Sequence, residues 1–155
     1  MISTILTSFK AGNMFNIIAK KNVEIQSFKI HTLLKSISTA TLYTKTGRWQ
    51  SHDKDPSAWT KLGTVSIECK GYGQPTIISD SSMPSVSVSQ GDTQAFYITL
   101  DTPELLYFYS DSNSSGSVFR EDAAIKVETG VGKGGLFGAT YPSRQLNGAV
   151  VYYTG

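Results

Sequence analysis

The 155-residue sequence predicts an all-β fold, an antiparallel two-sheet sandwich of the jelly-roll type with about nine or ten strands and little or no helix. Two observations lead to this prediction. Short segments of alternating apolar and polar residues recur along the chain, and turn residues separate them at the spacing typical of a sandwich or barrel. By contrast, no segment combines a sustained helical apolar stripe with capping residues. Because no crossover helices join the strands, we expect antiparallel pairing.

The first half of the chain carries four predicted strands, and two of them have features of their own. Between Ile25 and Phe28 the apolar residues change face, which indicates a β-bulge near Gln26 and Ser27. The last of the four segments alternates in two halves around Gly63. The four segments are residues 14–19, 23–30, 38–45 and 59–69.

The second half carries five further predicted strands, of which residues 95–100 are the most apolar. A turn is expected at 90–92, and a single helical turn at 55–59 or at 103–105. Residues 110–117 are rich in serine and predict a solvated hairpin loop. The five strand segments are residues 86–88, 95–100, 105–109, 124–129 and 149–154.

The glycine-rich segment 130–135 matches the dinucleotide pattern G-x-G-x-x-G by letter. That pattern requires a helix directly after it, and residues 136–142 show no helical pattern. We therefore expect an irregular loop between two strands rather than a nucleotide site.

A single domain is expected over residues 1–155, with a core of about 6–153, because the length suits one domain and no repeat or linker divides the chain. The inward-facing positions of the predicted strands should form its hydrophobic core. These positions are Phe15, Ile17, Ile25, Phe28, Ile30, Leu42, Phe96, Ile98, Ile125 and Val127.

Composition excludes several classes of protein. Hydrophobic residues make up 39% of the chain, enough apolar area to exclude a disordered one. The net charge is +2, and no basic run exceeds the pair Lys20–Lys21, so we expect no nucleic-acid partner. No segment is long and apolar enough to span a membrane, and the first residues lack the pattern of a signal peptide. The single cysteine, Cys69, lies on a predicted strand and should be an ordinary buried thiol.

Catalytic groupings are also missing from the sequence, so we expect a protein that is not an enzyme. The chain has only two histidines, His31 and His52, and no His or Cys pair with the spacing of a zinc site. A carboxylate pair for glycoside hydrolysis could still come from distant strands, which leaves a hydrolase as the third and weakest alternative.

Two polar loops contain oxygen ligands suitable for calcium, although neither has the ordered spacing of an EF-hand. One loop carries Asp53 and Asp55, and the other carries Asp111 and Asn113. We therefore expect no cofactor, with calcium as a possible exception.

Aromatic residues near polar loops predict a glycan site, because flat rings stack on sugars while amides and carboxylates bind the hydroxyl groups. The candidate ligand-binding residues are Trp49, His52, Asp53, Asp55, Tyr72 and Tyr141.

Several segments taken in order give the sequence a family resemblance. They are residues 12–19, 30–32, 43–47, 57–59, 94–97 and 128–132, followed by Asn147-Gly148 with Tyr152-Tyr153. Together they resemble an uncharacterised β-sandwich module that is repeated in large secreted proteins of diatoms and other marine microorganisms. The resemblance covers about residues 6–153, and it implies an accessory or structural module placed outside the cell or at its surface, with no assigned catalytic residues. One departure is Leu146, where the resemblance leads us to expect an aromatic residue.

Three functions follow in order of preference. The first is a non-catalytic extracellular accessory module that binds a glycan or matrix polymer through loop aromatics and polar groups. The second is a structural protein that assembles with copies of itself into a shell, filament or wall, since edge strands can pair with neighbours. The third is the carboxylate-pair hydrolase. Without a signal peptide in the chain, a cytoplasmic location stays open.

Overall fold

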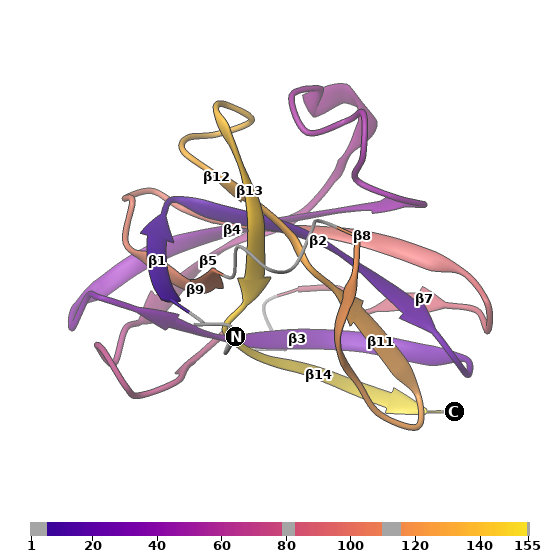
Figure 1. Ribbon diagram of the computed structural model, residues 1–155. Helices are drawn as coiled ribbons and strands as arrows, with labels where there is room; N and C mark the ends of the chain where they lie inside the picture. Colours follow the sequence, from indigo (N-terminus) through magenta and orange to yellow (C-terminus); the bar gives the residue numbers. More distant parts are fainter. Residues whose placement is uncertain (1–5, 79–82, 110–115, 155) are drawn as a thin grey trace, which may run out of the picture.

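A computed structural model describes residues 6–78, 83–109 and 116–154, and it shows an all-β chain (Figure 1). Fourteen strands and one 3-10 turn make up its regular structure. The strands are β1 (Leu6–Lys10), β2 (Gly12–Ala19), β3 (Val23–Thr32), β4 (Ile37–Thr46), β5 (Thr60–Glu68), β6 (Thr76–Ile77), β7 (Val86–Val88), β8 (Thr93–Leu100), β9 (Leu105–Tyr109), β10 (Val118–Glu121), β11 (Ile125–Glu128), β12 (Gly130–Lys133), β13 (Thr140–Leu146) and β14 (Gly148–Thr154).

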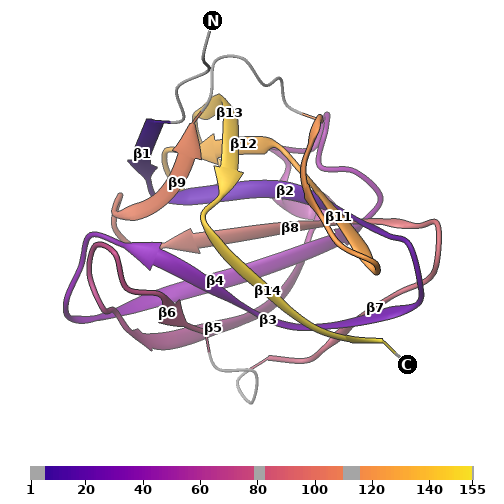
Figure 2. The ribbon, with the colours of Figure 1, turned by 60° about the horizontal axis from the view of Figure 1, so that its bottom comes forward.

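All fourteen strands are hydrogen-bonded into one sheet, in the order β14-β3-β9-β13-β12-β2-β8-β4-β5 with the remaining strands attached at its sides. β1 pairs with β9, β10 with β11, β11 with β2, and both β6 and β7 with β3. Every pair of these strands is antiparallel, which confirms the predicted class. The sheet curls into a nearly closed barrel rather than into two clearly separate sheets (Figures 1 and 2).

The main hydrophobic core lies inside this curled sheet, and all ten residues predicted for it are buried. At its centre the rings of Phe15, Phe28 and Phe96 pack with centroid distances of 5.2 to 6.3 Å. Cys69 also lies in this core as a free thiol, as predicted. Alternation along β2, β3 and β8 therefore specifies the inner face correctly.

Two local predictions are also confirmed. The register between β3 and β14 shifts where Ser27 pairs with Val151 and Ile25 pairs with Tyr152, which places the β-bulge at Gln26. The single helical turn is the 3-10 turn η1 (Pro56–Ala58), whereas β9 begins within the alternative segment at 103–105.

Five strands were not predicted: β1, β6, β10, β12 and β13. The prediction of an irregular loop at 130–135 was wrong, because residues 130–133 form the strand β12. Its glycines allow close approach, because a Cβ atom on Gly130 would lie 1.8 Å from the carbonyl oxygen of Met14 on the paired strand β2. A strand with so few side chains shows no alternation of apolar and polar residues, so alternation in the sequence cannot reveal it.

Two further sequence predictions need comment. Of the predicted solvated loop at 110–117, residues 110–115 lie outside the described residues. The described part of the chain contains no helix with the length and hydropathy that crossing a membrane requires.

Candidate functional site

A second hydrophobic cluster lies on the outer face of the sheet, opposite the main core. Met14 on β2 and Tyr97 on β8 alternate with inward-facing residues and contribute its floor. The segment between β4 and β5 covers this floor together with the β12–β13 hairpin; Figure 1 shows both rising from the same face of the sheet. The buried members of the cluster are Met14, Trp49, Trp59, Ala95, Tyr97 and Val131.

Trp49 belongs to this cluster and is only 7% exposed. Its backbone N–H donates to the Oδ1 atom of Asn16 at 3.0 Å, which fixes the loop over β2. The Nε1 atom of the neighbouring Trp59 donates to the carbonyl oxygen of His52 at 2.9 Å. A stacking platform needs an open ring face, and the indole of Trp49 is covered by protein instead.

Asp53 and Asp55 each bind groups of the protein itself. Asp55 caps η1, since its Oδ1 atom accepts from the N–H and the hydroxyl of Ser57. The Oδ2 atom of Asp53 accepts from the hydroxyl of Thr140 at 2.5 Å and lies 3.9 Å from the Nζ atom of Lys133. These contacts join the β4–β5 segment to the β12–β13 hairpin.

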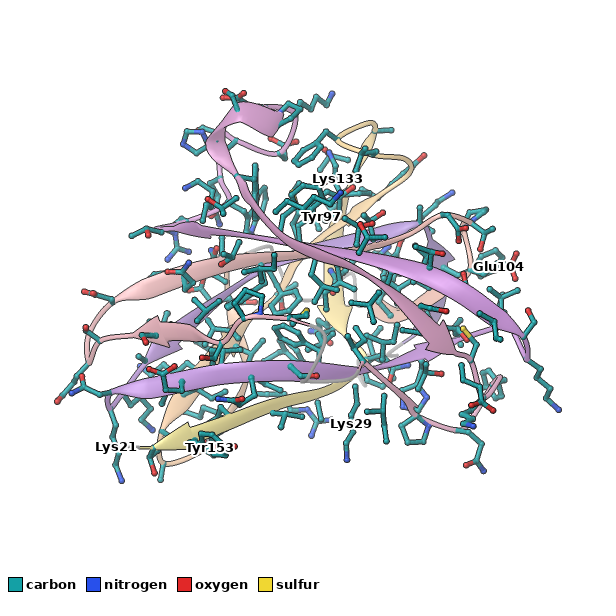
Figure 3. All side chains as sticks on the ribbon, turned by 180° about the vertical axis from the view of Figure 1, so that it is seen from behind. Lys21, Lys29, Tyr97, Glu104, Lys133 and Tyr153 are labelled. Atoms are coloured by element: carbon teal, nitrogen blue, oxygen red, sulfur yellow. The ribbon has the colours of Figure 1, made fainter. Side chains whose placement is uncertain are left out.

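Lys133 is completely buried beneath that junction, close to Tyr97 in Figure 3. Its ammonium donates to the carbonyl oxygen of Gly138 and to Thr140, both at 2.7 Å. Burial lowers the pKa of the Lys133 ammonium, although the charge of Asp53 opposes that shift. The pKa of Asp53 lies below its ordinary value: burial would raise it, but the Thr140 hydrogen bond and Lys133 outweigh that effect.

The other predicted ligand residues are distributed over the molecule. Tyr141 follows Thr140 on β13 and lies under the ammonium of Lys10, which is 4.5 Å from its ring centroid. Tyr72 is 72% exposed in the β5–β6 connection, between two glycines with positive φ. The structure thus places His52, Asp53 and Asp55 on one segment with Tyr141 on the adjoining hairpin, and it does not bring Tyr72 to them.

The described residues that were predicted as calcium ligands bind groups of the protein instead. Asp53 and Asp55 are engaged as above, and Asp111 and Asn113 lie outside the described residues. Within residues 6–78, 83–109 and 116–154 no group of three or more His, Cys, Asp or Glu side chains could hold a metal ion.

An open groove lies elsewhere, between the β10–β11 hairpin and β14. Figure 2 shows these two elements side by side, with the orange hairpin next to the yellow strand. β14 pairs only with β3 and β10 only with β11 among the described strands, so the groove is the seam at which the barrel fails to close. Its volume is about 520 Å³.

The floor of this groove is apolar because it is the open side of the main core. Its buried members are Ile125, Val127 and Leu146, and the half-buried rings of Phe108 and Phe119 adjoin them. The rim is polar and is formed by Lys29, His31, Arg120, Glu121, Asp122, Asn147 and Tyr152.

A side-chain bridge crosses one end of the groove. The phenol of Tyr152 on β14 donates to the Oδ2 atom of Asp122, while the Oδ1 atom of Asp122 accepts from the N–H groups of Ala124 and Ile125 at 2.8 and 3.0 Å. Burial would raise the pKa of Asp122, but the hydrogen bonds from Tyr152, Ala124 and Ile125 together outweigh it and leave that pKa below its ordinary value. The bond to Asp122 raises the pKa of Tyr152 to about 12. Both groups therefore keep the protonation states that hold the bridge at neutral pH.

Sequence reasoning missed this groove, although one signal pointed toward it. Leu146, Asn147 and Gly148 line the groove, and Leu146 is the position at which the sequence analysis expected an aromatic residue. The other wall comes from β10, a strand without a recognisable pattern, so the two walls could not be connected from sequence.

Comparison with known proteins adds no relative to these observations. No protein-family model matches the chain, and no curated protein matches it.

Proposed function

We propose that this protein is a non-catalytic binding module and that a glycan occupies the groove between β14 and the β10–β11 hairpin. The observation that carries the proposal is the groove itself, an open space of about 520 Å³ with an apolar floor and a polar rim. A volume of this size and this division of polarity are typical of ligand sites.

The groups around the groove suit sugar rings. Phe108 and Phe119 offer apolar ring surface in the floor, against which the carbon face of a pyranose can pack. The Asn147 amide and the edge of β14 offer donors and acceptors for hydroxyl groups. This assignment moves the expected site from the loop aromatics to the seam of the barrel.

Binding rather than hydrolysis is supported by the carboxylates that line the groove. Asp122 is held by two backbone N–H groups and by Tyr152, and Glu121 accepts from Lys20 at 3.0 Å. Asp122 is thereby committed to contacts within the protein, which disfavours its use as the acid or the nucleophile of a glycosidase.

The family resemblance extends this proposal to location and context. We infer an accessory module outside the cell or at its surface, as in the secreted proteins that the sequence resembles. In the same proposal the barrel is a distorted jelly-roll sandwich, because β3 with β14 faces β2, β8 and β4 across one core.

Blocking the groove tests the proposed function. Ala149 is exposed and lines the groove, so Ala149→Trp should fill it without disturbing the core. We expect a glycan array to give a signal with the unchanged protein and none with Ala149→Trp. The matched control is Ala139→Trp, an exposed alanine before β13, which should keep the signal. A signal that survives Ala149→Trp would refute the location, and the absence of any signal at high protein concentration would refute the function.

A second candidate function, self-association, rests on a different observation. Exposed apolar side chains occur in the β3–β4 turn, at the start of β4, in the β5–β6 connection and on β6, and a hydrogen bond from the Cys69 N–H to the Ser36 carbonyl oxygen joins the turn to the connection. They are Leu33, Ile37, Tyr72 and Ile77, with exposures of 41 to 74%. Light scattering after size-exclusion chromatography should show a species larger than a monomer, which Ile37→Lys dissociates. A monomer at high concentration would exclude this candidate.

A further inference from the structure

We infer that the groove selects acidic glycans, whose sugars carry carboxylate or sulfate groups; this inference rests on the proposed function and specifies its ligand. The observation behind it is an imbalance among the charged groups of the rim. The acidic groups are matched by partners within the protein, whereas two cationic groups have no such partner among the residues that the structure describes.

The acidic side of the rim is already compensated. Glu121 forms an ion pair with Lys20, whose ammonium also donates to the carbonyl oxygen of Asp122 at 2.8 Å. The carboxylate of Asp122 accepts two backbone hydrogen bonds and one from Tyr152. A ligand cation would therefore have to compete with Lys20 for Glu121 and with three hydrogen bonds for Asp122.

The cationic side of the rim has no such compensation. Lys29 and Arg120 are exposed, and neither has an acidic partner or a side-chain hydrogen bond among the described residues. Figure 3 shows Lys29 extending from β3 away from the sheet. Because Lys29 lies on β3 beside β14 and Arg120 lies on β10, the two charges stand on opposite sides of the apolar floor.

An anionic sugar can contact the apolar floor and a cationic group of the rim at the same time. Its ring can pack on the apolar floor while its carboxylate or sulfate accepts hydrogen bonds from the guanidinium or the ammonium, which are the strong, charge-assisted kind. His31 adds a hydrogen-bonding imidazole to the same rim, and burial lowers its pKa, which favours the neutral form.

An acidic peptide added as an extra strand fits this groove less well. Such a peptide would have to run along the free edge of β14, and the bridge between Tyr152 and Asp122 crosses that path. Within the groove only the edge from Gly148 to Val150 stays clear of the bridge, which is short for a stable strand pairing.

Matched pairs of oligosaccharides test the inference by titration calorimetry. The first pair is homogalacturonan oligosaccharides and their fully methyl-esterified forms, and the second is sulfated and desulfated carrageenan oligosaccharides. Within at least one pair, the charged form should bind and the neutral form should bind at least about tenfold more weakly, with an affinity that falls as salt rises. The pair that responds identifies carboxylate or sulfate as the anion.

Charge-removing variants then assign the effect to the groove. Lys29→Gln and Arg120→Gln should each weaken binding of the charged oligosaccharide by about tenfold, since each removes one charge-assisted contact at an exposed rim. The matched control is Lys61→Gln on β5, at the other edge of the sheet, which should leave the affinity unchanged.

Each alternative outcome overturns a different statement. Equal affinity for charged and neutral forms, with no effect of the two variants, refutes the selection of anions and leaves the glycan groove standing. Loss of affinity in Lys61→Gln equal to that in Lys29→Gln assigns the effect to net charge and refutes the site. Binding of poly-glutamate without binding of any oligosaccharide refutes both the glycan function and this inference.

Discussion

At the scale of single residues, Trp49 was predicted as a ligand residue from its neighbours in the sequence, whereas its burial depends on distant residues. Trp49 stands among polar loop residues, yet it is buried in one cluster with Met14 of β2 and Tyr97 of β8. No local pattern reveals that burial, because the outer face of β2 and β8 becomes apolar only where Met14 and Tyr97 are brought together. The main core was predictable because alternation is local, and the outer cluster was not.

Removal of the Trp49 side chain should destabilise the protein rather than affect a ligand alone. Trp49→Ala leaves a cavity in the outer cluster, and we expect the free energy of unfolding in urea to fall by about 3 kcal/mol. The control is Tyr72→Ala, whose ring is 72% exposed and whose loss should change stability little. Equal stability of Trp49→Ala and the unchanged protein would contradict the packing described here.

The buried ammonium of Lys133 should depend on Asp53. Asp53→Asn removes the one carboxylate that the described residues place beside a fully buried cation, so we expect a loss of about 1 to 2 kcal/mol in the free energy of unfolding. In a double-mutant cycle with Lys133→Met, the coupling energy should be about 1 kcal/mol. The exposed pair of Lys20 and Glu121 provides the control cycle, in which we expect coupling close to zero.

At the scale of elements, the strands that were predicted are those with apolar alternation, and the strands that were missed lack it. β13 contains Pro142 and Arg144, and three of the four side chains of β10 are exposed. Their partners hold them in the sheet, since β13 pairs with β9 and β12 and β10 pairs with β11. Tertiary pairing thus overrides a weak local preference in these segments.

Close approach of β14 to β3 requires a glycine at position 148. A Cβ atom there would lie 1.9 Å from the carbonyl oxygen of Lys29. Gly148→Ala should therefore push the strands apart and lower the free energy of unfolding by about 2 kcal/mol, measured in urea. Gly135→Ala is the matched control, because no atom lies within 4 Å of its added Cβ, and it should be nearly neutral. Similar losses in the two variants would contradict this explanation.

At the scale of the whole molecule, the all-β class followed from the sequence, but the closure of the sheet did not. Closure depends on which strands pair, and the joining pairs, such as β3 with β9 and β11 with β2, connect segments far apart in the chain. The candidate groove depends on the same information, because it exists only where β14 and β10 fail to pair.

Acid should destabilise the whole fold over a pH range that the pKa values of two aspartates define. The pKa values of Asp53 and Asp122 are lowered in the folded protein, so their stabilisation is fully present above the ordinary value of 3.8 and is lost as the pH falls through the lowered values. We expect melting temperatures measured from pH 7 to pH 2 to fall below about pH 4.

The double variant Asp53→Asn/Asp122→Asn should start from a lower melting temperature and show a flatter decline over the same window. Asp92→Asn, at the exposed turn before β8, is the control and should keep the steep decline. An unchanged slope in the double variant would mean that other groups govern acid unfolding.

The position of β2 within the sheet also has a consequence for the rate of folding. β2 pairs with β8, β11 and β12, and a hydrogen bond from the Asn13 side chain to the Val131 carbonyl oxygen joins residues 118 positions apart. Such pairings must close long loops before any contact stabilises them. We therefore expect refolding on a timescale of milliseconds to seconds or slower, because β2 reaches its partners only when the second half of the chain has come back to it.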